Sequence, residues 1–162
     1  MLATSSIQTL RTAPTATVAD LQDVLAERAR GYHDLTVRAQ QLRYDADTGM
    51  IEVQGHREFG LRPLALQQVA AKLGIPGSYL AKCDRDLRAE NINHWLDQNR
   101  SRSFLLRCDG DEIRAVLSDR YAPVDHLPLA SWLADAFGPQ ARLRFELSEE
   151  QLHVQFVQGE GH

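Results

Sequence analysis

The 162-residue chain predicts an α+β protein, in which antiparallel β-hairpins pack with a central block of helices, a helical hairpin plus a third helix. Two observations support this class. Apolar residues recur at helical spacing in some blocks of the chain, and in other blocks they alternate with a period of two. Strands that alternate one by one with helices would instead indicate a parallel α/β sheet.

Helices are predicted where apolar residues recur every three or four positions. Thr17 and Asp20 have the spacing of a capping box, so the first helix begins directly after Thr17. Pro63 suits a first helical turn, and Gly74 suits a helix end. The predicted helices cover residues 18–30, 63–73, 76–83, 87–98 and 127–137, with Tyr79, Leu80, Cys83, Ile92, Trp95 and Leu96 on buried faces.

Strands are predicted where apolar and polar residues alternate between turn sequences. These patterns predict three hairpins, over residues 35–55, 104–117 and 141–157. The first hairpin turns at Asp45 to Gly49, and the second turns through a loop that contains Gly110. We find no internal repeat in the sequence.

The first 14 residues are small and polar without a period, which predicts a flexible N-terminal arm. The length fits a single α+β domain over residues 15–158. Because the sequence stops soon after a predicted strand, one interpretation is that it is the N-terminal part of a longer protein. No apolar run is long enough to span a membrane, and the N-terminus does not resemble a secretory signal. Two cysteines, Cys83 and Cys108, have no CxxC partner, so we expect buried thiols and a cytoplasmic protein.

The net charge of −4 is unevenly distributed along the chain. Residues 1–56 carry a charge of −2, residues 57–120 carry +2, and residues 121–162 carry −4. Of the 18 cationic side chains, only Lys72 and Lys82 are lysines. Arginine can grip a phosphate through two hydrogen bonds, so an anionic partner for the middle segment is one interpretation. The other interpretation is that a GC-rich genome favours arginine codons, since surface arginines need no partner.

Motifs of common enzyme classes are missing from the sequence. It contains no phosphate-binding GxxxxGK[ST] loop, no GxGxxG, no GxSxG and no HExxH. Asp119, Asp125 and His126 are a weak candidate for a cation site, and Asp125 also suits the N-cap of the helix that follows it. We therefore expect no cofactor, no metal and no catalytic residues, and an enzyme is the less favoured class.

Residues 66–83 have the pattern of a helix-turn-helix, with a small residue near the end of one helix and a Leu-Gly-Ile turn. In a DNA reader, the second helix and its surroundings would present basic side chains to phosphates and base edges. The basic residues predicted for this patch are Lys72, Lys82, Arg85 and Arg88. An ordinary helical hairpin that packs on the sheet is the alternative.

The hairpin over residues 104–117 and its extension offer a second candidate surface. Arg107 and Arg114 occupy strands of one hairpin, and Arg120 and Tyr121 follow it directly. Guanidinium groups beside an aromatic ring suit a single nucleic-acid strand, because the arginines contact phosphates and the ring stacks on a base. Alternatively, Tyr121 covers the core and the arginines pair with nearby aspartates.

Four segments resemble a known family when they are taken together: LGIPGSYL from Leu73, ENINHWL from Glu90, FLLR from Phe104 and IRAVLSDRYAPVD from Ile113. This combination resembles a family of phage- and plasmid-like proteins that is classed as domain of unknown function 932. The resemblance covers roughly residues 55–130 and is most specific in RAVLSDRY. It implies an origin in mobile genetic elements, where replication and recombination proteins are common.

These observations lead us to expect a non-enzymatic protein that binds nucleic acid, favouring single-stranded DNA, in replication or recombination. Its negative net charge requires the cations to gather on one face, with affinity multiplied if the chain forms a homo-oligomer. The alternatives are a protein-interaction module that modulates a host factor or defence system, and a helix-turn-helix regulator of duplex DNA.

Overall fold

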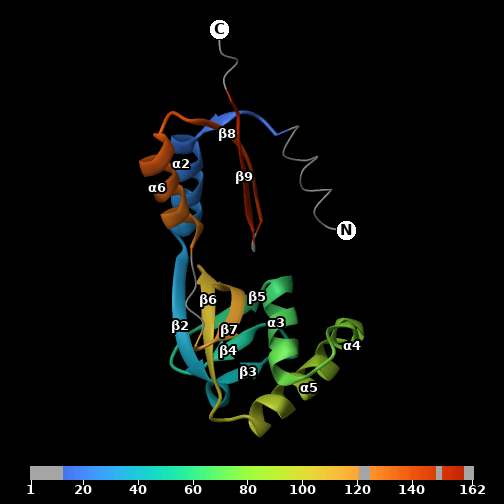
Figure 1. The fold of residues 1–162 in the computed structure, drawn as a ribbon. Helices are drawn as coiled ribbons and strands as arrows, with labels where there is room; N and C mark the ends of the chain where they lie inside the picture. Colours follow the sequence, from blue (N-terminus) through green and yellow to red (C-terminus); the bar gives the residue numbers. More distant parts are fainter. Residues whose placement is uncertain (1–12, 121–124, 149–150, 159–162) are drawn as a thin grey trace. The chain divides into compact units, whose positions relative to one another are not determined.

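The computed structural model describes residues 13–120, 125–148 and 151–158, and it confirms the α+β class (Figure 1). The chain divides into two compact units, residues 1–30 with 123–162, and residues 31–122. The expected domain over residues 15–158 includes parts of both units and stays a prediction. Residues 1–12 of the expected arm lie outside the described residues.

The first unit combines two helices with a small antiparallel sheet. Its elements are β1 (Ala16–Thr17), α2 (Val18–Ala29), α6 (His126–Phe137), β8 (Arg142–Leu147) and β9 (Leu152–Phe156). The strands lie in the order β1-β8-β9, and α2 and α6 lie side by side (Figure 1). The hairpin predicted over residues 141–157 is confirmed as β8 and β9. The capping box is also confirmed, because the Thr17 hydroxyl accepts from the Asp20 N–H and the Asp20 carboxylate accepts from the Thr17 N–H.

The second unit is a six-stranded mixed sheet with three helices. Its elements are β2 (Tyr32–Arg38), η1 (Ala39–Gln41), β3 (Leu42–Tyr44), β4 (Ile51–Val53), β5 (Glu58–Leu61), α3 (Pro63–Leu73), α4 (Gly77–Lys82), α5 (Arg85–Gln98), β6 (Ser103–Asp109) and β7 (Glu112–Ser118). The strand order is β2-β6-β7-β5-β4-β3. The neighbours pair antiparallel except β5 and β7, which are parallel and are connected through the helices.

One predicted hairpin is wrong in its pairing. Residues 35–40 were expected to pair with residues 50–55, but β2 pairs along its whole length with β6. The predicted turn at Asp45 to Gly49 is present, and it joins β3 to β4. The chain bends at η1, so the strand that returns after this turn meets β3 instead of β2. Alternation identifies a strand and its buried face, but it does not identify the partner strand.

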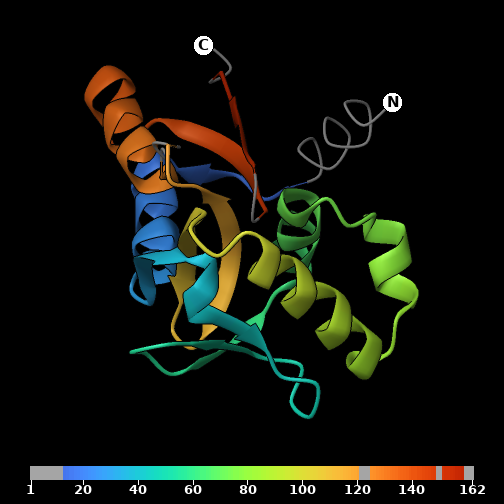
Figure 2. The same ribbon diagram turned by 90° about the horizontal axis from the view of Figure 1, so that it is seen from below.

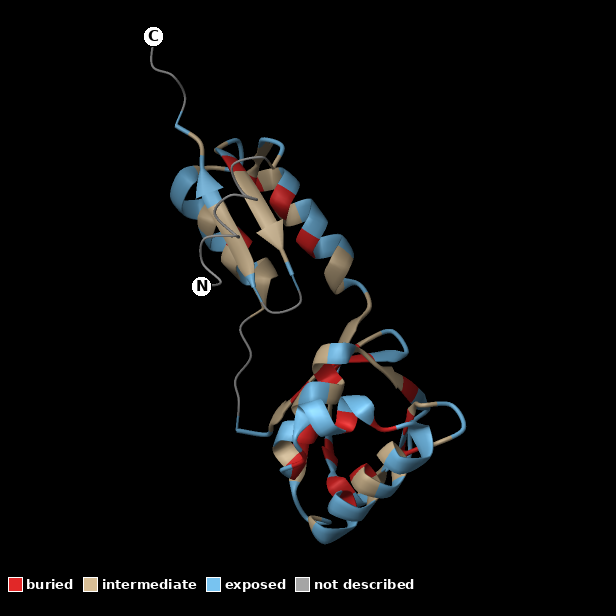
Figure 3. Ribbon diagram, turned by 90° about the vertical axis from the view of Figure 1, so that its right-hand side faces the viewer, coloured by how far each residue is buried: buried red, intermediate tan, exposed pale blue. Residues whose placement is uncertain are grey.

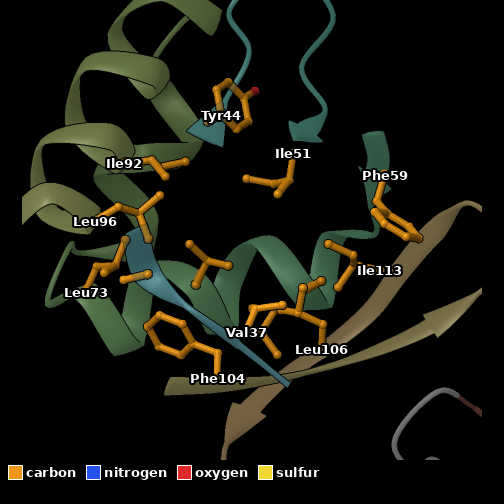
Figure 4. Close-up of a cluster of buried hydrophobic side chains, with 14 of the residues drawn as sticks. Val37, Tyr44, Ile51, Phe59, Leu73, Ile92, Leu96, Phe104, Leu106 and Ile113 are labelled. Carbon is orange, nitrogen blue, oxygen red and sulfur yellow. The ribbon is translucent and has the colours of Figure 1, made fainter. Parts of the chain in front are cut away.

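The core of the second unit lies between the sheet and its helices. Figure 4 shows side chains from β2, β6 and β7, among them Val37, Leu106 and Ile113, converging with Leu73 of α3 and Ile92 of α5. Figure 2 shows α3, α4 and α5 following one another around this unit, and Figure 3 shows that much of their outer surface is exposed.

Two aromatic residues lie on the outside of these helices, contrary to the prediction. Tyr79 is 43% exposed and Trp95 is 41% exposed, whereas Leu80, Ile92 and Leu96 are buried as expected. Helix α4 has only six residues, too few for a helical repeat to fix which side is buried. Among the described residues, no helix has the length and apolar character that crossing a membrane requires.

Candidate nucleic-acid interface

The two arginines predicted to contact nucleic acid from the sheet are both buried. Arg107 of β6 and Arg114 of β7 are each 8% exposed. The Nε atom of Arg107 donates to Oδ1 of Asp34 at 3.2 Å, and the Arg114 guanidinium lies 3.8 Å from the ring centre of Tyr32. Both guanidinium groups therefore contact neighbouring side chains of the same sheet.

Two carboxylates of this hairpin, Asp109 and Glu112, also have a cationic partner. Arg62, which follows β5, donates to Asp109 at 2.6 Å and to Glu112 at 2.7 Å. The alternative interpretation expected the arginines of the hairpin to pair with its aspartates, but Asp109 pairs with Arg62, and Arg107 pairs with Asp34 of β2. Arg120 is exposed, and its backbone N–H donates to the Ser118 hydroxyl at 3.1 Å. Tyr121 lies outside the described residues.

The four basic residues of the predicted helical patch differ in their contacts. Arg88 donates from Nε to the Leu80 carbonyl at 3.1 Å and from Nη2 to the Ala81 carbonyl at 3.3 Å. Arg85 donates from Nη1 to the Asp47 carbonyl at 3.1 Å. These two guanidinium groups bind backbone oxygens, so they link α5 to α4 and to the β3–β4 turn. Lys82 is exposed and Lys72 is partly buried.

The structure does not gather the predicted residues into one groove. Leu106 and Ile113 lie on the sheet face that forms the core with the helices. Side chains alternate along a strand, so the neighbouring Arg107 and Arg114 lie on the opposite face. Lys72 and Lys82 belong to the helices on the core side. Among the described residues of the predicted set, Arg107 and Arg114 therefore lie on one side of the sheet, and Lys72, Lys82, Arg85 and Arg88 belong to helices on the other.

A different set of arginines lines a hollow in the second unit. One part, of about 460 Å³, is bordered by η1, β3, β4 and the β4–β5 connection, and it includes Arg43 and Arg57. An adjoining part, of about 400 Å³, is bordered by the α5–β6 connection and includes Arg100 and Arg102. Because Gln40 and Asp97 border both parts, we treat them as one surface, the arginine hollow.

Backbone hydrogen bonds fix the walls of the arginine hollow. The Arg102 and Arg100 carbonyls accept from the N–H groups of Ala39 and Gln40, at 2.8 and 3.1 Å, which ties the α5–β6 connection to η1. The Gln41 carbonyl accepts from the N–H of Gln54 at 2.8 Å, which ties η1 to the end of β4. The hollow is therefore built on hydrogen-bonded backbone.

The guanidinium groups of this hollow are available to an anion. Arg43, Arg57, Arg100 and Arg102 are all exposed, and within the described part of the chain none of them lies within 4.0 Å of a carboxylate oxygen. Arg57 lies over the ring of Phe59 at 5.7 Å from its centre. An aromatic face orients a guanidinium group and leaves its N–H edge open.

Arg102 is held at the C-terminal end of α3. It lies over the ring of Phe104, at 5.4 Å from its centre, and it donates to the carbonyl of Lys72. A cation at the C-terminus of a helix is favoured by the helix dipole. The contact with Lys72 is made by its backbone carbonyl, so it places the end of α3 beside Arg102.

Carboxylates limit where an anion can bind in the hollow. Glu52 and Glu58 border its larger part, and together with Asp45 their oxygen atoms lie within 4.8 Å of one another. Arg43 lies directly opposite Glu52 in the β3–β4 ladder. Asp97 is the single carboxylate that borders the smaller part, among its described residues. The positive charge is therefore most concentrated around Arg100 and Arg102.

The two cysteines, Cys83 and Cys108, are buried, and the thiol of Cys108 has a raised pKa. The pKa of Cys108 is raised from 9.0 to about 11, chiefly by burial and then by the Asp34 carboxylate. A thiol with this pKa is protonated at neutral pH and is a poor nucleophile. Asp119 belongs to the second unit, whereas Asp125 and His126 belong to the first, and the expected absence of a metal there stays a prediction.

Sequence reasoning missed the arginine hollow, although its signal is visible. The segment NRSR, residues 99–102, follows the predicted helix directly, and two glutamines stand at 40 and 41. Periodicity assigns an arginine on a regular strand to one face of a sheet. Arginines in loops follow no period, so the sequence does not predict which surface they share. Comparison of the chain with protein-family models, with curated proteins and with solved structures finds no match.

Proposed function

We propose that the second unit binds single-stranded nucleic acid along the arginine hollow. The observation that carries this proposal is the set of exposed arginines that line one hollow and have no carboxylate partner within 4.0 Å among the residues that the structure describes. Arg100 and Arg102 contact phosphates at its most positive part, and Arg57 contacts the strand farther along. The mobile-element origin implied by the sequence resemblance agrees with a role in replication or recombination.

The polar lining supports a nucleic acid over a simple anion. The side chains of Gln40, Gln54 and Asn99 border the hollow, and amide groups both donate and accept hydrogen bonds, as base edges do. Recognition of a duplex usually requires a helix or strand ribbon that enters a groove, whereas a concave surface accepts a flexible strand. The concave shape therefore favours a single strand.

The net charge of the chain is divided unequally between its two units. The second unit contains thirteen Lys and Arg against thirteen Asp and Glu, so its net charge is zero, and the first unit carries −4. Binding of a polyanion then depends on local clustering rather than on the overall field. We expect modest affinity that falls steeply with salt, because phosphate contacts release counterions.

The test is a fluorescence-anisotropy titration of the full chain with a labelled single strand, at about 50 mM and about 200 mM salt. The variant R57A/R100A removes two cations from the hollow, and R30A/R142A removes two exposed cations from the first unit as a matched control. We expect the first variant to lose most of the affinity and the control to retain it. Equal losses in both variants, or no binding at low salt, would contradict the proposal.

A protein partner is a second candidate, favoured by a separate observation. Tyr79 of α4 and Leu87 and Trp95 of α5 are between 39% and 43% exposed. Asn91 lies between them in sequence, and its side chain donates to the Tyr79 hydroxyl at 3.3 Å, which links the two helices. Exposed aromatic residues of this kind are common in protein interfaces. The variant Y79A/W95A would abolish capture of such a partner and leave titration with a single strand unchanged.

The helix-turn-helix alternative has less support. A recognition helix presents side chains to a groove from its outer face. Here the second helix, α4, has six residues, and the guanidinium group of Arg88 binds its last carbonyls. A preference for one duplex sequence, lost in the variant K82A, would favour this alternative over a single strand.

A further inference from the structure

Strand β9 forms an open edge of the sheet in the first unit. The strand order is β1-β8-β9, and among the described residues no strand pairs with the outer side of β9. An open edge presents unpaired backbone N–H and C=O groups, which can pair with another strand.

The hydrogen bonds of the β8–β9 hairpin show which residues face this open edge. The Ser148 N–H donates to the Gln151 carbonyl at 2.9 Å, and the Val157 N–H donates to the Arg142 carbonyl at 3.0 Å. Residues of an antiparallel strand alternate between inward and outward backbone groups. Gln151 and Val157 bond to the β8 side, and alternation assigns His153 and Gln155 to that side too. The N–H and C=O groups of Leu152, Val154 and Phe156 therefore point outward.

The other sheet edges carry features that discourage pairing, and β9 does not. Charged side chains protect edge strands. Strand β2 contains Asp34 and Arg38, whereas residues 151–158 contain no charged residue and no proline. The edge strand β1 has only two residues.

Edge strand β3 is closed in another way, by a side chain. The Asp45 N–H bonds to the Met50 carbonyl of the hairpin, so the groups of Tyr44 point away from β4. Asn93 accepts from the Tyr44 N–H and donates to its C=O. Among the described strand edges, β9 alone combines length, lack of charge and open backbone groups.

We propose that β9 pairs with β9 of a second copy of this chain, antiparallel and centred on Val154. In this register Leu152 lies opposite Phe156 of the other copy, and Val154 lies opposite its counterpart. These are the residues whose backbone groups point outward, so each finds a partner in the ladder. The strand is therefore complementary to itself without any shift of register.

The side chains also match in this arrangement. Leu152 and Val154 pack toward α2 and α6 within their own unit, and the ring of Phe156 lies 4.5 Å from that of Phe137 at the end of α6. A twofold axis perpendicular to the sheet keeps both helix layers on the same face. The partially exposed Phe137 and Phe156 then contact Leu152 of the second copy, and His153 lies opposite Gln155 on the other face.

The first test measures the mass of the full chain by sedimentation velocity over a range of concentrations, with the variant V154P. Proline removes an N–H that points outward, so pairing with β8 is retained. We expect a concentration-dependent dimer that is lost in V154P. Circular dichroism and thermal unfolding confirm that the variant is folded. A dimer that persists in folded V154P, or a wild-type chain that stays monomeric at every concentration, would overturn the proposal.

A charge-exchange experiment distinguishes a second copy from a foreign partner. The variants H153K/Q155K and H153E/Q155E each place like charges opposite one another at the proposed interface, on the face away from the helices. Each variant alone should dimerise roughly 2- to 30-fold more weakly than the wild type, because like charges oppose each other at two cross-strand positions. Mixing the two should restore a heterodimer. Failure of the mixture to associate would overturn the proposed pairing of β9 with its counterpart.

Discussion

The side-chain amide of Asn93 bonds to both backbone groups of Tyr44, accepting from its N–H at 2.8 Å and donating to its C=O at 2.9 Å. One residue of α5 thereby takes the place of a further strand at the edge of the six-stranded sheet. The contact also joins two walls of the arginine hollow, since β3 carries Arg43 and α5 carries Asp97.

We expect the substitution N93A to lower the free energy of unfolding by roughly 1–3 kcal/mol, because it leaves backbone groups of a buried residue without partners. Urea unfolding measures the change, and amide hydrogen exchange at Tyr44 should accelerate. Asn91 on the same helix bonds at the exposed surface and serves as control. If N91A is as destabilising as N93A, the two contacts with Tyr44 have no special importance.

Removal of the Arg107 side chain should lower stability without changing binding, and removal of the Arg100 side chain should do the reverse. The substitution R107A breaks the contact with Asp34 in a buried part of the sheet, so it should lower the free energy of unfolding by roughly 1–3 kcal/mol and leave binding of a single strand unchanged. R100A should weaken binding and leave thermal unfolding unchanged. A loss of affinity in folded R107A would restore the sheet face as the binding surface.

The sequence predicts element types well and long-range pairing poorly. Gly74 and Pro63 mark the ends of α3 as expected, and the capping box at Thr17 is present, because such signals act within one helical turn. The pairing of β2 with β6 depends on contacts between residues far apart in sequence, which no local pattern contains. Burial of Arg107 has the same origin, since its environment is set by β2.

Loss of hollow arginines should change the salt dependence of binding in a stepwise manner. Each phosphate contact to a single strand contributes about 0.7 to the slope of log K against log salt. R100A should therefore reduce the slope by about 0.7, and R57A/R100A by about twice this amount. Titrations at several salt concentrations provide the slopes. A slope that is unchanged in both variants would mean that these residues do not contact phosphate.

Cys108 should make the stability of the second unit dependent on alkaline pH. Burial raises the pKa of its thiol from 9.0 to about 11, so between these values the unfolded chain releases a proton that the folded chain retains. Stability is fully present below pH 9 and falls by up to about 1.4 kcal/mol per pH unit as the pH rises toward 11. Urea unfolding of the wild type and of C108A across this range measures the free energy of unfolding at each pH. The decrease that Cys108 causes should be absent in C108A. Parallel pH profiles in both proteins would contradict this assignment.

The pairing of β2 with β6 has a consequence for synthesis of the chain on the ribosome. Arg38 pairs with Ser103, and the 65 positions that separate them must be translated before this ladder can close. At roughly 5–20 residues per second, a completed β2 waits several seconds without its partner. During that interval the nascent chain exposes an unpaired strand, and shielding by a chaperone would then matter more than it does for the locally formed β6–β7 hairpin.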